Sequence, residues 1–181
     1  HGVVRALRKG ALDLAPPSSL GLVGHSRGGG MALLLARELG DVAAVATWSG
    51  VGRARRHTDA ELAAWKRLGT IEVLHQRLRI RLPLHWEIAE DCLRHESTRF
   101  DIAAAAGALG RPWLQVHGTA DTTVPFAEAE ELAAAAGPGH QLLAVAEADH
   151  VYGTKHPWAG SSVDADAVFD VTLTFLARHL D

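Results

Sequence analysis

The chain has 181 residues, enough for one domain with a sizeable hydrophobic core. Its 18 Lys and Arg residues against 21 Asp and Glu give a net charge of -3, which argues against a nucleic-acid partner, and no apolar run is long enough to span a membrane. Cys92 is the only cysteine, so no internal disulfide can form, and we expect a cytoplasmic protein. Because the chain begins at His1 and its one methionine is Met31, we expect the natural protein to have residues before His1.

The first third of the chain predicts a helix, a buried strand, a second helix and a second buried strand. Residues 1–14 indicate an amphipathic helix interrupted near Gly10. Residues 20–23 form a short apolar run typical of a buried strand, and an almost entirely apolar helix follows from Met31 to Leu39, where Gly40 ends it. Residues 42–48 are small and β-branched, which predicts the second strand.

The composition changes after residue 52. Thr58 and Glu61 have the spacing of a capping box for a helix that ends at Gly69. Residues 71–84 alternate in polarity and predict a hairpin, with one face formed by Arg77, Arg79 and Arg81, and residues 84–94 predict another helix. We expect this block, about residues 52–100, to be a small cap inserted over the functional site.

The alternation of helices and strands resumes in the second half of the chain. We expect helices over 102–109, 125–136 and 164–180, and strands over 112–117 and 141–146. In the last helix one face is formed by Phe169, Leu173, Leu176 and Leu180. Four buried strands alternating with helices predict a single α/β domain with a mostly parallel sheet flanked by helices.

The most informative motif is G-x-S-x-G, formed by residues 24–28 between a predicted strand and a predicted helix. This spacing places Ser26 on a strained turn, where we expect a Cβ at Gly24 or at Gly28 to collide with the neighbouring turn. The serine is then exposed to substrate. The amide of Arg27, at the positive end of the helix, points to where a carbonyl oxygen becomes negative.

Two loops after predicted strands supply the partners that a nucleophilic serine needs. Asp121 follows the strand at 112–117, and His150 follows the strand at 141–146. Since reacting groups of open α/β sheets lie beyond the carboxyl ends of the strands, His150 is the candidate base and Asp121 the candidate acid. Asp149 is the alternative acid, and we expect His25 and His117 to be neighbours rather than reacting groups. No metal-ligand spacing is present, so we expect no metal and no cofactor.

The strings GHSRGG, HGTADTTVP and ADHVYG, in this order, resemble the α/β-hydrolase fold. Within it they are similar to serine esterases and dienelactone-hydrolase-like enzymes, which are related to the catalytic domain of prolyl oligopeptidases. The resemblance implies that Ser26 is the nucleophile, His150 the general base, Asp121 the orienting acid and the Arg27 N–H one oxyanion donor. Dienelactone hydrolases proper have a cysteine at the position of Ser26, so the resemblance favours an esterase acting on a small-molecule carboxylic ester.

The resemblance also implies strands before the nucleophile strand, and fewer residues precede Ser26 here than those strands would need. We therefore expect an N-terminally incomplete fold, an open sheet edge that permits self-association, and a second oxyanion donor that the sequence does not identify. Two alternatives stay open. One is a peptidase of the prolyl-oligopeptidase type, and the other is a non-catalytic remnant of a hydrolase.

Overall fold

A four-stranded parallel sheet forms the centre of the computed structural model, which describes residues 2–11, 13–75 and 78–180. The strand order is β1-β2-β5-β6, and every neighbouring pair is parallel. The strands are β1 (Gly21–His25), β2 (Ala44–Trp48), β5 (Trp113–Gly118) and β6 (His140–Val145). All four predicted strands and their parallel arrangement are therefore confirmed. Strands β1 and β6 form the two edges of this sheet.

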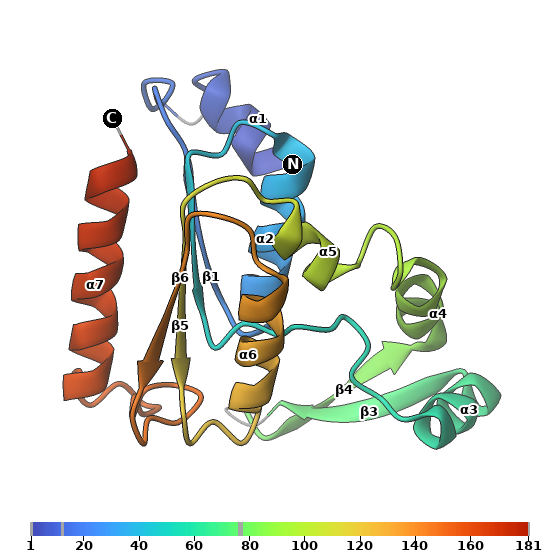
Figure 1. The fold of residues 1–181 in the computed structure, drawn as a ribbon. Helices are drawn as coiled ribbons and strands as arrows, with labels where there is room; N and C mark the ends of the chain where they lie inside the picture. The colour runs from blue at the N-terminus through green and yellow to red at the C-terminus, as the bar shows by residue number, and fades with distance from the viewer. Residues whose placement is uncertain (1, 12, 76–77, 181) are drawn as a thin grey trace.

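Helices cover both faces of the sheet (Figure 1). Helix α7 (Val163–His179) lies alone on one face, while α2 (Arg27–Leu39) and α6 (Phe126–Ala135) lie on the other. The short α5 (Ile102–Gly107) packs against α2 and α6, and α1 (Gly2–Arg8) precedes β1. Each face has its own core, because one cluster of buried side chains joins the sheet to α2, α5 and α6 and a second joins it to α7.

The buried face of α7 differs from the prediction. Its buried residues are Ala165, Val168, Thr172 and Phe175, whereas Phe169 and Leu173 are exposed. The apolar pattern was misleading because a threonine occupies the inner face. The Thr172 hydroxyl accepts a hydrogen bond from the Trp48 indole N–H at 2.9 Å and donates one to the Val168 carbonyl, so its polar group is satisfied inside the core.

The segment between β2 and α5 stands beside α2 and α6, away from α7 (Figure 1). It contains α3 (Asp59–Leu68), the antiparallel pair β3 (Thr70–His75) and β4 (Ile80–His85), and α4 (Trp86–His95). The capping box is confirmed, since Thr58 accepts a hydrogen bond from the Glu61 N–H and the Glu61 carboxylate accepts one from the Thr58 N–H. The segment also has a small core of its own, formed by Leu62, Trp65 and Ala89.

The expected row of three arginines on the hairpin is not formed. Arg81 lies on β4 opposite Leu74, but Arg79 lies in the turn with φ 54°. A positive φ at a non-glycine residue marks a tight reversal of the chain, which takes Arg79 out of the alternation of the strand. Arg77 lies outside the described residues.

Most other predicted boundaries hold to within a few residues, with two helices shorter than expected. Helix α1 ends at Arg8, and Gly10 follows it with φ 64°. Helix α5 ends at Gly107 rather than at residue 109. In the described ranges, none of the helices combines the length and the hydropathy that a transmembrane span requires.

Candidate active site

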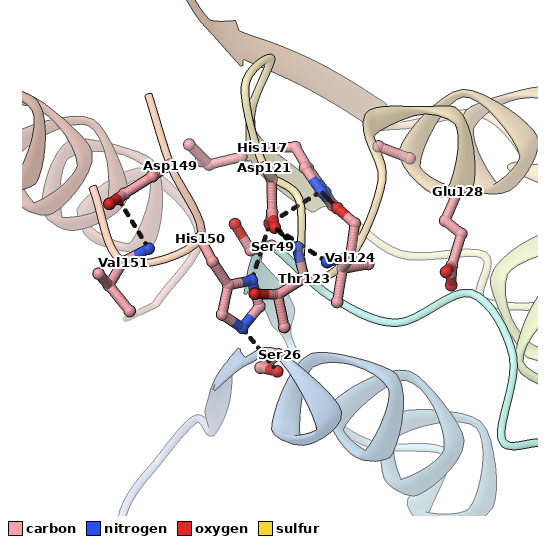
Figure 2. A network of polar contacts seen from close by, with 12 residues as sticks. Ser26, Ser49, His117, Asp121, Thr123, Val124, Glu128, Asp149, His150 and Val151 are labelled. Atoms are coloured by element: carbon pink, nitrogen blue, oxygen red, sulfur yellow. Dashed lines mark hydrogen bonds and ion pairs between the residues drawn. The ribbon is translucent and has the colours of Figure 1, made fainter. Parts of the chain in front are cut away.

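Ser26 lies on a sharp turn between β1 and α2, with φ 57° and ψ -123°. This backbone conformation is strained for any residue with a side chain, at a cost of about 1–3 kcal/mol. Three backbone hydrogen bonds hold it: the Ser26 N–H donates to the Trp48 carbonyl at 2.8 Å, and the Ser26 carbonyl accepts from Gly29 and Val51. The strain thus has a structural use, because it points the hydroxyl away from the sheet and toward the other loops (Figure 2).

The glycines of this turn are needed to different extents. A Cβ on Gly24 would lie 2.2 Å from the Gly28 carbonyl oxygen, and a Cβ on Gly29 would lie 2.7 Å from the Gly50 Cα. At Gly28, by contrast, a Cβ would meet no atom within 4 Å. The expected collision at Gly24 is confirmed and the one at Gly28 is wrong, because Gly28 lies on the exposed side of the first turn of α2.

Asp121 lies in the loop after β5, and its side chain is fully buried. One carboxylate oxygen accepts hydrogen bonds from the N–H groups of Thr123 and Val124, both at 2.9 Å. The other oxygen faces His150. Burial raises the pKa of Asp121, but the hydrogen bonds from Val124, His150 and Thr123 outweigh it, so that the pKa lies below its ordinary value. Asp121 is therefore ionised at neutral pH.

His150 lies between Asp121 and Ser26 (Figure 2). Its Nδ1 is 2.8 Å from Asp121 Oδ2, and its Nε2 is 2.9 Å from Ser26 Oγ. An ionised carboxylate can only accept hydrogen bonds, so Nδ1 carries the proton, and Nε2 is left as the acceptor of the Ser26 hydroxyl proton. The structure thus brings together the three residues that the sequence singled out, from the ends of β5, β6 and β1.

Asp149, the alternative acid, and His117 form hydrogen bonds outside the chain of contacts from Asp121 to Ser26. Asp149 accepts hydrogen bonds from the N–H groups of Val151 and Gly153, at 3.0 and 2.8 Å, and thereby shapes its own loop. His117 is fully buried and donates from Nε2 to the Val124 carbonyl at 2.9 Å, while this nitrogen is 3.4 Å from Asp121 Oδ2. Its Nδ1 has no hydrogen-bond partner in the described part of the chain.

Two residues whose contacts the sequence did not reveal position the His150 loop. The His25 ring donates from Nε2 to the His150 carbonyl at 2.8 Å, and the two rings are 4.8 Å apart. Tyr152 is buried, and its hydroxyl donates to the Val116 carbonyl and accepts from the Ser49 hydroxyl, both at 3.1 Å. These bonds attach the loop to β1 and to the interior of the sheet. Tyr152 belongs to the string ADHVYG, so the motif that contains His150 was the one sequence feature that could have indicated its role.

An ion pair joins the chain after β2 to α6, close to the Asp121 loop. The Glu128 carboxylate accepts hydrogen bonds from Arg56 at 2.6 Å and from the Gly52 N–H at 2.9 Å. Both charged side chains are largely buried. Since unpairing one partner of a buried ion pair is costly, this contact fixes where the segment leading to α3 leaves the sheet.

Metal binding has no support in the described ranges, which contain no group of three or more His, Cys, Asp or Glu side chains suited to hold an ion. The reacting groups that are present are a hydroxyl, an imidazole and a carboxylate in one hydrogen-bonded chain. This arrangement can activate the hydroxyl as a nucleophile with no further group.

No protein-family model matches this sequence, and no curated protein sequence matches it. Solved structures do match. The esterase domain of a Rhodothermus marinus protein is 22% identical with a TM-score of 0.67, over 99% of this chain and 69% of that one. The α/β hydrolase GrgF from Penicillium sp. sh18 is 15% identical with a TM-score of 0.75, over 99% and 70%. Est1E from Butyrivibrio proteoclasticus, with ferulic acid bound, is 16% identical with a TM-score of 0.67, over 97% and 67%.

These similarities, together with the parallel sheet and its flanking helices, show that the chain has the α/β-hydrolase fold. The predicted fold class is thereby confirmed. At these levels of identity the likeness concerns the fold, and the chemistry has to be argued from the site itself.

Proposed function

We propose that this chain is a serine hydrolase that cleaves carboxylic esters through an acyl-enzyme on Ser26. The observation that carries the proposal is the continuous hydrogen-bonded chain from Asp121 through His150 to Ser26, with both links under 3 Å. The names of two similar structures, an esterase domain and Est1E, add support for ester substrates. A serine at position 26 favours this class over dienelactone hydrolases proper, which have a cysteine there.

In the first half of the reaction, Ser26 Oγ attacks the ester carbonyl carbon while its proton moves to His150 Nε2. The ionised Asp121 stabilises the imidazolium that forms, since its Oδ2 accepts from Nδ1 at 2.8 Å. Negative charge develops on the carbonyl oxygen, where the Arg27 N–H at the start of α2 donates a hydrogen bond. The carbon–oxygen bond to the alcohol then breaks, and His150 returns its proton to the leaving oxygen.

The second half repeats these steps with water. His150 Nε2 takes a proton from a water molecule while the water oxygen adds to the acyl carbon. The bond from the acyl carbon to Ser26 Oγ then breaks, His150 returns the proton to Oγ, and the carboxylic acid leaves. The exposure of the two side chains agrees with this, because the His150 side chain is 16% exposed while that of Asp121 is fully buried. Water can therefore reach His150, the base, but not Asp121, the acid.

Turnover of a short-chain para-nitrophenyl ester by the purified chain tests the proposal. Ser26→Ala and His150→Ala should each reduce kcat at least about 1,000-fold, because the members of such a triad act as one unit. Asp121→Asn should also reduce kcat strongly, and the matched variant Asp149→Asn much less, because in the described residues the Asp149 carboxylate forms hydrogen bonds to its own loop and not to His150. Turnover that survives in Ser26→Ala would contradict the proposal, and no turnover by the folded, unmodified chain would favour the remnant alternative.

A further inference from the structure

Arg27, the residue after the reacting serine, lies on the walls of two cavities between α2 and the segment that follows β2. The cavities have volumes of about 320 and 420 Å³, and both are lined by Arg27, Ala54, Ile88 and Cys92. Volumes in this range hold small organic ligands. Arg27 directly follows Ser26 in the chain, so both cavities begin one residue away from the reacting serine, which itself lines neither of them.

The walls of both cavities are largely apolar. Leu62 and Trp65 of α3 and Leu84 of β4 line the smaller cavity. Met31 and Leu34 of α2 and Ile102 of α5 line the larger one. No residue of the loop 147–153, which carries His150, lines either cavity. Since His150 has to protonate the leaving alcohol oxygen, a cavity away from this loop suits the acyl part of an ester.

The cationic side chains around the smaller cavity differ in whether their charge is balanced. Arg55 pairs with Asp59 at 2.5 Å, and Arg56 pairs with Glu128 at 2.6 Å. His57 has Glu61 at 4.0 Å. Within the described ranges, the Arg27 guanidinium forms neither an ion pair nor a hydrogen bond to a side chain.

Two carboxylates on the wall of the larger cavity do not balance Arg27. Asp91 pairs with Arg99 at 2.9 Å, and Glu87 forms no ion pair with Arg27 in the part of the chain that the structure describes. The positive charge does act on the cavity interior, as Cys92 shows. Burial raises the pKa of the Cys92 thiol and Glu96 raises it further, while the charge of Arg27 lowers it. Arg27 and Cys92 both lie on the wall that the two cavities share.

We propose that Arg27 binds a second, anionic group on the acyl part of the substrate, so that the preferred substrates are monoesters of dicarboxylic acids. This inference rests on the proposed esterase function and names its substrate class. A planar guanidinium donates two parallel hydrogen bonds to a carboxylate, and Arg27 is exposed, so a substrate carboxylate can reach it. The apolar walls then contact the carbon chain between the carboxylate and the ester.

The test compares two esters of equal chain length, the mono-para-nitrophenyl ester of glutaric acid and para-nitrophenyl pentanoate. The measured quantity is the ratio of their kcat/KM values. We expect the ratio to exceed one in the unmodified chain and to fall roughly 10- to 100-fold in Arg27→Gln, the range of a charge-assisted hydrogen bond. Arg27→Lys should retain part of the ratio. Arg81→Gln, which removes an exposed cation on β4, should leave the ratio unchanged.

The ratio separates recognition of the acyl group from effects on catalysis, since any disturbance of the Arg27 amide slows both esters alike. A ratio below one in the unmodified chain, or one that Arg27→Gln leaves unchanged, would overturn this inference. If the neutral ester is still hydrolysed in a Ser26-dependent way, the proposed function survives that result. If Ser26→Ala hydrolyses both esters as fast as the unmodified chain, both proposals are wrong.

Discussion

At the scale of single residues, the turn around Ser26 shows that two glycines of one motif can have different roles. Gly24 makes room for the Gly28 carbonyl, which passes 2.2 Å from where a Cβ would be. Gly28 itself is open to solvent and has helical backbone conformation. The motif therefore depends sterically on its first glycine, and the second is not required by close packing.

A matched pair of variants tests this difference. Gly24→Ala should destabilise the fold by about 3 kcal/mol or more, because backbone atoms on both sides of the turn would have to move. Gly28→Ala should leave the free energy of unfolding within about 1 kcal/mol of the original and shift it upward, since alanine favours a helix over glycine. Urea unfolding of both variants measures the two values. If both variants lost the same free energy of unfolding, the two glycines would not differ in their steric role.

Tyr152 gives a second prediction at this scale, because it is the only tyrosine of the chain. Burial raises its pKa to about 12, against an ordinary value of 10.0. The neutral phenol is favoured in the folded state, so its contribution to stability is complete below about pH 10 and is lost as the pH rises through about 12. Tyrosinate absorbance should therefore rise near pH 12 in the folded chain and near pH 10 in denaturant. A midpoint near 10 in chain that is still folded would contradict the burial of this hydroxyl.

At the scale of elements, α7 shows what an apolar pattern can leave undecided. The helix has two candidate faces one residue apart, and the inner one includes Thr172, whose hydrogen bond with Trp48 cannot be inferred from periodicity. By contrast, the C-terminal end of α2 and both ends of α3 could be predicted nearly to the residue. Their ends are determined by local features, the capping box at Thr58 and glycines 40 and 69 in left-handed conformation.

Two phenylalanines on α7 test which face is inside. Phe175→Ala should cost about 3–5 kcal/mol, because the side chain is 5% exposed and leaves a cavity. Phe169→Ala should cost about 1 kcal/mol, since this ring is 48% exposed and forms a T-shaped contact with the Trp48 ring. Thermal or urea unfolding of the two variants gives the comparison. If Phe169→Ala lost more stability than Phe175→Ala, the buried face of α7 would be the one expected from the sequence.

At the scale of the whole molecule, the site follows from topology. Parallel strands end at the same edge of the sheet, so the loops after β1, β5 and β6 meet there, and this allowed Ser26, Asp121 and His150 to be selected before their distances were known. The contacts of His25, Tyr152 and Glu128 could not be selected in this way. They join segments far apart in the sequence, and their residue types alone do not reveal a partner.

The most direct test of the central claim is covalent labelling of the purified chain with a fluorophosphonate, followed by mass spectrometry of the intact chain and of its peptides. We predict one adduct per chain, located on Ser26, absent in Ser26→Ala and formed much more slowly in His150→Ala. The exposed Ser161, which has no histidine beside it among the described contacts, serves as an internal control and should stay unlabelled. An adduct on another serine, or no adduct in a folded chain, would contradict the proposal that Ser26 is an activated nucleophile.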